Sequence, residues 1–170
     1  MDTGSWLGVT HQDAFQFFLE HLRELTDVVE PPANELSYNA SVLAHFATTS
    51  TSSQDSFPAC PASLTTVFDQ FVMDRSQHVA PDIMEAAAAQ CLLLTGFFQE
   101  QQRRRHQIAW YAGLGMSFYL RASIAGRDRA RSRLMETMSK RFEFWRVQQH
   151  RLAVELREEA DQIAGLRPIA

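Results

Sequence analysis

The spacing of apolar residues restricts the possible folds of this chain more than any other feature of the sequence. Apolar side chains recur every three or four positions along most of its length, as in the run of Phe15, Phe18 and Leu22. This spacing places them on one face of an α-helix. No run alternates apolar and polar residues between turn signals, so no strand is predicted. The sequence therefore predicts an all-α fold.

Helix-starting and helix-breaking residues divide the first part of the chain. Thr10, with an acidic residue three positions later, is typical of a helix N-terminus. Pro31 and Pro32 are expected to end that helix, because proline removes a backbone donor and clashes with the preceding turn. Asn34 is expected to cap a second helix. Residues 48–57 are mostly polar and predict an exposed loop.

Three further helices are predicted after this loop. They begin near Ser63, at Pro81 and near residue 107, and the last of them stops near Gly126. Pro81 suits a first helical position, where its missing N–H would have no partner. The helix that follows Pro81 is apolar on most sides, which predicts a central place in the bundle. The chain of 170 residues is therefore expected to form a single-domain bundle of about six helices.

The C-terminal region is expected to form one long helix, from the arginine-rich segment almost to Gly165. Its apolar seam has nearly heptad spacing and comprises Met138, Phe142, Trp145, Gln149, Leu152, Leu156 and Ile163. A helix of about 35 residues would be about 50 Å long, which exceeds the diameter of a globule of this size. Part of the seam, including Trp145, would then be exposed unless a second copy covered it. We therefore expect a homodimer that uses the last helix.

Neither a membrane span nor an exported protein is expected. The longest mostly apolar run, from Ala86 to Phe98, falls short of the roughly 20 residues that a membrane helix needs. The first residues show neither the positive start nor the apolar stretch of a secretory signal. The two cysteines, Cys60 and Cys91, form no CxxC pair and are expected to be free thiols. We expect a cytoplasmic protein.

The net charge of −4 conceals a strong asymmetry. Residues 1–100 contain 13 acidic and two basic side chains, whereas residues 101–170 contain seven acidic and 14 basic ones. This division predicts that the two halves pack with opposite charges facing, or that they complement a second copy. Nucleic-acid binding is the alternative, although an overall negative charge is untypical of that class.

The sequence contains no recognised catalytic, cofactor or metal motif. The six histidines are scattered, and none belongs to a Glu-x-x-His pair of the kind that binds metals in helical bundles. Gly113 and Gly115 follow no predicted strand, which argues against a phosphate-binding loop. Cys91 lies in an apolar run, where a thiol is unreactive. We therefore predict no catalytic residue, no metal and no cofactor.

A basic cluster supplies the first candidate functional residues. It consists of Arg103, Arg104, Arg105 and His106. Guanidinium groups suit carboxylates and phosphates, so the cluster is a candidate site for an acidic protein segment or a small anionic ligand. The alternative is a solvated helix junction, in which Glu100 pairs with one of the arginines.

An aromatic group beside this cluster supplies the others. It consists of Trp110, Tyr111, Phe118 and Tyr119, at helical spacing. The spacing favours packing in the core and at an interface, with the hydroxyls reaching polar partners at the edge. A ligand pocket between the fourth and fifth helices is the alternative.

The region from Gly96 to Tyr119 resembles a motif found in a family of uncharacterised bacterial all-helical proteins. The matching residues are Gly96, Phe97, Phe98, Tyr111, Gly113, Gly115 and Tyr119, and Trp110 stands where an aromatic residue is usual. The resemblance implies a helical fold and marks this region as the defining part of the chain. It implies no activity.

Three functions are compatible with these features. We favour a non-catalytic helical interaction or regulatory module that associates with itself. The second is a small-molecule binder or enzyme, with a site for an anionic or amphipathic ligand between the fourth and fifth helices. The third is a nucleic-acid binder that uses the arginine-rich segments.

Overall fold

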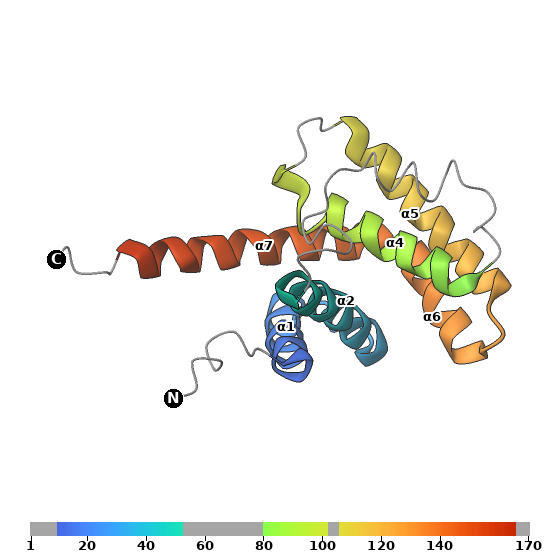
Figure 1. Ribbon diagram of the computed structural model, residues 1–170, viewed down its shortest axis with the longest axis horizontal. Helices are drawn as coiled ribbons and strands as arrows, with labels where there is room; N and C mark the ends of the chain where they lie inside the picture. Colours follow the sequence, from blue (N-terminus) through green and yellow to red (C-terminus); the bar gives the residue numbers. More distant parts are fainter. Residues whose placement is uncertain (1–9, 53–79, 102–105, 166–170) are drawn as a thin grey trace.

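The computed structural model describes residues 10–52, 80–101 and 106–165, and within these ranges it forms helices and no strands. The elements are α1 (His11–Leu25), α2 (Ala33–Ser52), α4 (Pro81–Thr95), the short 3-10 helix η3 (Gln99–Gln101), α5 (His106–Ala125), α6 (Arg129–Lys140) and α7 (Phe142–Gly165). Figure 1 shows α4, α5 and α6 grouped at one end, the α1–α2 hairpin beside α7, and α7 extending from the bundle. The predicted all-α bundle is confirmed. The helix predicted from Ser63 lies outside the described residues.

The first helix, α1, begins as predicted and ends earlier than predicted. The backbone N–H of Asp13 donates to Oγ1 of Thr10 (3.1 Å), and the Asp13 carboxylate accepts from the Thr10 backbone, which completes a capping box. The helix ends at Leu25, well before the two prolines. Thr26 follows, and its hydroxyl donates to the carbonyl oxygen of Leu22 (2.6 Å). The prolines therefore follow a turn that has already ended the helix.

The second helix, α2, is longer than the sequence indicates. The predicted exposed loop, residues 48–57, is helical as far as Ser52. The Thr48 hydroxyl donates to the carbonyl oxygen of Ala44 (2.9 Å), so its polar group is satisfied within the helix. Threonine-rich sequence therefore does not end a helix here, and the loop prediction is wrong for its first half. The rest of that segment lies outside the described residues.

The fourth helix, α4, lies at the centre of the bundle, as its apolar sequence predicts. Pro81 occupies the first turn. The buried apolar residues of α4 are Met84, Ala87, Ala88, Cys91, Leu92, Leu93 and Leu94. They pack along α5 and also reach α7. Among the described helices, none combines the length and the hydropathy needed to span a membrane.

The C-terminal region forms two helices, not the single long helix predicted. Arg141 separates α6 from α7 with φ −107° and ψ 18°, outside the helical range. Its guanidinium Nε lies 2.8 Å from Oε2 of Glu35 on α2. The break allows α6 and α7 to run in different directions (Figure 1).

The apolar seam of this region belongs to the core of the chain itself. Met138, Phe142, Trp145, Gln149 and Leu152 are all completely buried. The sequence correctly places them on one side, but the expectation that Trp145 would be exposed without a second copy is wrong. The α1–α2 hairpin and α4 both contact α7 and help to cover the seam. Trp145 therefore gives no reason to expect a dimer.

Candidate interaction surface

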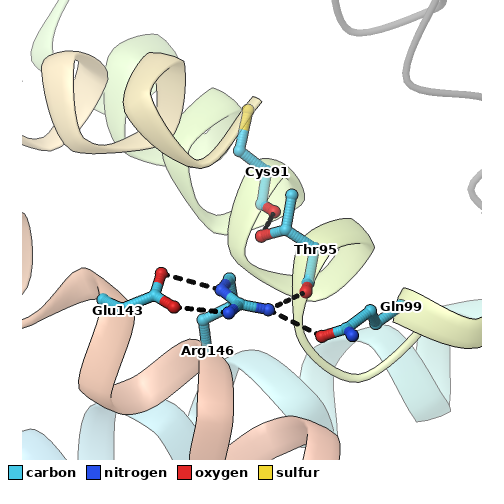
Figure 2. A network of polar contacts seen from close by, with 5 residues as sticks. All are labelled: Cys91, Thr95, Gln99, Glu143 and Arg146. Carbon is cyan, nitrogen blue, oxygen red and sulfur yellow. Dashed lines mark hydrogen bonds and ion pairs between the residues drawn. The ribbon is translucent and has the colours of Figure 1, made fainter. Parts of the chain in front are cut away.

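An arginine from α7 holds the turn that follows α4 (Figure 2). Arg146 Nη1 donates to the carbonyl oxygen of Thr95 (3.1 Å) and to Oε1 of Gln99 (2.6 Å). Its Nε donates to Oε2 of Glu143 (2.8 Å), and the Thr95 hydroxyl donates to the carbonyl oxygen of Cys91 (2.6 Å). A cation thus satisfies the last carbonyl of α4, where the helix dipole favours positive charge. Arg146 therefore has a structural role.

The Gly-Phe-Phe element is the packed end of α4. A Cβ added to Gly96 would lie 2.9 Å from the carbonyl oxygen of Arg146, so only glycine allows α7 to approach this closely. Phe97 and Phe98 are half-buried against the core, and the Phe98 ring meets that of Phe46 on α2 with centroids 4.9 Å apart. This part of the motif therefore positions α4, α2 and α7.

Tyr119, a predicted site residue, is a core residue. It is completely buried, and the hydroxyl of Tyr38 on α2 donates to its hydroxyl (3.2 Å). Burial raises the pKa of both tyrosines, so both stay neutral near physiological pH. Arg131 lies 5.4 Å from the centroid of the Tyr38 ring, and its Nε donates to Oε2 of Glu85 (3.1 Å). The tyrosine pair is thus held in place by both helix packing and a surface ion pair.

The predicted aromatic group is divided between the two sides of α5. Tyr111 is 6% exposed, whereas Trp110 is 51% exposed. Their rings are nearly perpendicular, with centroids 4.7 Å apart. Phe118 and Tyr119 are buried like Tyr111. Among these four residues, only Trp110 is available to a partner.

The predicted basic cluster falls mostly outside the described residues. Arg103, Arg104 and Arg105 are in that part of the chain. His106 is the first residue of α5, and its side chain is likewise not described. Glu100 forms an ion pair with Arg157 of α7.

Cys91 is a poor nucleophile. It is completely buried, and burial raises the pKa of its thiol to about 12, so almost no thiolate exists near neutral pH. Within the described ranges, no group of three or more His, Cys, Asp and Glu side chains is arranged to hold a metal ion.

The side of α5 that faces away from the core exposes a row of apolar side chains, with the exposed Arg121 at its edge. Its large side chains are Trp110 (51% exposed), Met116 (38%), Leu120 (46%) and Ile124 (77%). Gly113 lies on the same side, and a Cβ added there would meet no atom within 4 Å. Positions three or four apart lie on one side of a helix, so these five residues form one stripe. We call this stripe the outer face of α5; grouped exposed apolar residues of this kind are typical of protein–protein contacts.

A buried polar cluster between α2 and α7 was not predicted. Oε2 of Glu35 accepts from Nε1 of Trp145 (2.8 Å), and Nε2 of Gln149 donates to Oδ1 of Asn39 (3.1 Å). These four residues are almost completely buried. The sequence offers one signal, the polar Gln149 within an apolar seam. The cluster joins the α1–α2 hairpin to the rest of the bundle.

Comparison with known proteins gives no relative. No protein-family model matches the sequence, and no curated protein or solved structure shows significant similarity to it. The resemblance of the region from Gly96 to Tyr119 to a bacterial helical family stays a prediction.

Proposed function

We propose that this protein is a non-catalytic helical interaction module that forms a homodimer through the outer face of α5. The supporting observation is the exposure of Trp110, Met116, Leu120 and Ile124 along one side of a single helix. Each Å² of apolar surface removed from water stabilises a contact by about 25 cal/mol. Covering this stripe would therefore favour association.

The composition of the outer face suits a second copy of the same chain. None of its five residues is charged, and the exposed Arg121 lies only at the edge of the stripe, so two copies can meet along it with little repulsion between like charges. Gly113 has no side chain and open space beside it, which allows a partner helix to approach closely. An antiparallel crossing near residue 117 would place Trp110 of one copy beside Ile124 of the other, and Leu120 of one copy close to Gly113 of the other. Such a contact uses the same surface on both copies, as two-fold symmetry requires.

The ligand-binding alternative has less support. Its proposed lining residues Tyr111 and Tyr119 are buried in the core. A Cβ at Gly115 would lie 2.6 Å from Cε2 of Phe142, so a ring of this chain already occupies the indentation at that glycine. An acidic protein segment or small anionic ligand at the Arg103–Arg105 cluster stays a second candidate partner, and a cytoplasmic location is part of the proposal.

A double substitution on α5 tests the homodimer. We expect the unmodified protein to have about twice the chain mass of 19.4 kDa by size-exclusion chromatography with light scattering. The variant with Leu120→Glu and Ile124→Glu should be monomeric, because two carboxylates would be buried in the contact. Its helical circular dichroism should be unchanged, since both side chains are exposed.

Matched substitutions outside α5 provide the control. Val28 and Val29 are also exposed apolar residues, at 94% and 57%, in the turn after α1. The variant with Val28→Glu and Val29→Glu should remain dimeric. A monomeric unmodified protein, or a dimeric α5 variant, would overturn the proposal.

A further inference from the structure

Exposed charges of opposite sign lie on two separate helices. Glu155, Glu158 and Glu159 are exposed on α7 and share one side of that helix. Arg129 and Arg133 are exposed on α6, one turn apart. Within the described parts of the chain, none of these five side chains forms an ion pair.

Their neighbours, in contrast, are paired. The pairs join Arg131 to Glu85, Lys140 to Glu136 and Arg157 to Glu100. Most other charged side chains of these helices are thus used within the molecule. Among the described residues, Asp161 on α7 is also exposed and outside any ion pair, so it adds to the acidic set.

The two sets cannot meet within one chain. Arg129 and Arg133 lie in the first half of α6, and α7 leads away from α6 after the break (Figure 1). The rise from Phe142 to Glu158 alone is about 24 Å at 1.5 Å per residue. Exposed charges that far apart are screened, because the Debye length in physiological salt is about 8 Å.

The acidic set lies on a projecting segment. We call residues 155–165 the α7 arm; all of residues 157–162 are exposed, and the arm extends away from the bundle (Figure 1). A helix of this kind can reach the surface of another molecule without any change in its own fold.

We propose that the α7 arm of one copy lies against Arg129 and Arg133 on α6 of a second copy. The inference rests on the homodimer proposed above and adds a second contact to it. In a two-fold dimer the contact occurs twice, since each copy supplies one arm and one α6. Exposed ion pairs are individually weak, so the main effects are on the orientation of the two copies and on the salt dependence of the dimer.

A charge-exchange experiment tests this contact. The arm variant carries Glu155→Lys, Glu158→Lys and Glu159→Lys, and the α6 variant carries Arg129→Glu and Arg133→Glu. In each homodimer like charges would face each other twice, so sedimentation equilibrium at low salt should give a Kd about tenfold or more above that of the unmodified protein. The helices should tolerate these changes, because acidic residues early in α6 and basic residues late in α7 suit the helix dipole.

Mixing the two variants gives the decisive measurement. In the mixed dimer the lysines of one arm face the introduced glutamates, and the unmodified arm faces the unmodified arginines. Both contacts are then attractive, so the mixed dimer should have a Kd close to that of the unmodified protein. An intramolecular role for these charges would give no such recovery on mixing.

A control variant reverses charges elsewhere on the surface. Glu24 and Asp27 are exposed near the end of α1, and the variant with Glu24→Lys and Asp27→Lys should dimerise normally. Unchanged Kd values for the arm and α6 variants, or no preference for the mixed dimer, would overturn the arm contact. If the variant with Leu120→Glu and Ile124→Glu is monomeric in that case, the proposed α5 homodimer stands without the arm contact. If this variant is dimeric and the mixed arm and α6 variants recover their affinity, the result would support the arm contact and reject the α5 contact. A protein that is monomeric at every concentration would reject both.

Discussion

The two sides of α5 use the same kinds of residue in opposite ways. On the inner side Phe118 is buried, and Gly115 lies within a short distance of the ring of Phe142. On the outer side Trp110 is half exposed, and Gly113 opens to empty space. Each side thus has an aromatic residue and a glycine, but only the inner pair fills the core. The position of a residue around the helix decides its role here more than its chemical type.

The largest difference between the two sides should come from removing an aromatic ring. Phe118 is 1% exposed, and Phe118→Ala should lower the free energy of unfolding by about 3–5 kcal/mol because it leaves a cavity. Trp110→Ala should lower it by at most about 1 kcal/mol, because half of that ring is already in water. Urea denaturation followed by circular dichroism measures both. Equal losses would contradict the orientation of α5.

Adding one methyl group to the inner glycine should also destabilise the fold. A Cβ at Gly115 would lie 2.6 Å from Cε2 of Phe142 and 2.8 Å from Cβ of Cys91. These neighbours belong to a packed ring and to α4, so Gly115→Ala should cost about 1–3 kcal/mol despite the better helix propensity of alanine. A melting temperature equal to or above that of the unmodified protein would show that the core can rearrange there.

Alkaline pH should lower the free energy of unfolding through two buried groups at the inner side of α5. Burial raises the pKa of the Cys91 thiol to about 12 and that of the Tyr119 hydroxyl well above its ordinary value. As pH rises past about 9, the unfolded chain loses protons that the folded chain retains, so the stability present at lower pH is lost. Each such group contributes a slope of up to about 1.4 kcal/mol per pH unit.

Denaturation curves between pH 8 and 11 measure this slope. Cys91→Ala should reduce the slope at the lower end of this pH range, because in the unfolded chain the thiol ionises at a lower pH than the phenol of Tyr119. The outer face contains no group that titrates in this range, so Leu120→Ala should leave the slope unchanged. A free energy of unfolding that stays constant up to pH 11 would contradict the burial of Cys91 and Tyr119.

The smallest expected effect is a gain in stability, whereas all the changes above reduce it. Gly113 has open space beside it, and Gly113→Ala should raise the free energy of unfolding by about 0.5–1 kcal/mol, since alanine favours the helix. Thermal unfolding at low protein concentration measures the change without a contribution from self-association. Together with Gly115→Ala, it tests the same substitution two positions apart with opposite outcomes.

Local signals in the sequence predict much of the fold. The capping pair at Thr10 and the proline at position 81 both mark helix starts, because each acts through neighbouring backbone groups. The break at Arg141 was not predictable in this way. The break accompanies a contact between Arg141 and Glu35, which is distant in the sequence, so no local sequence pattern predicts it.

The candidate surface was predicted only in part. The aromatic group contained Trp110, which is exposed, together with Tyr111 and Tyr119, which are buried. Residues that follow one another in a sequence motif lie on both sides of a helix. The outer face of α5, in contrast, consists of residues three or four positions apart. Met116 and Leu120 could have been recognised as lying on the side away from the buried tyrosines, but their exposure depends on where α4 and α6 pack.

The buried carboxylate of Glu35 determines how the α1–α2 hairpin can separate from α7. This side chain is 2% exposed, accepts a hydrogen bond from Trp145 and lies against the guanidinium of Arg141. A slight separation would remove these partners before water could replace them, which costs more than complete exposure of the carboxylate. Intermediate openings are therefore the least favourable. The amide hydrogens of α1 and α2 should exchange with solvent together, in one cooperative opening, while those of α4 stay protected.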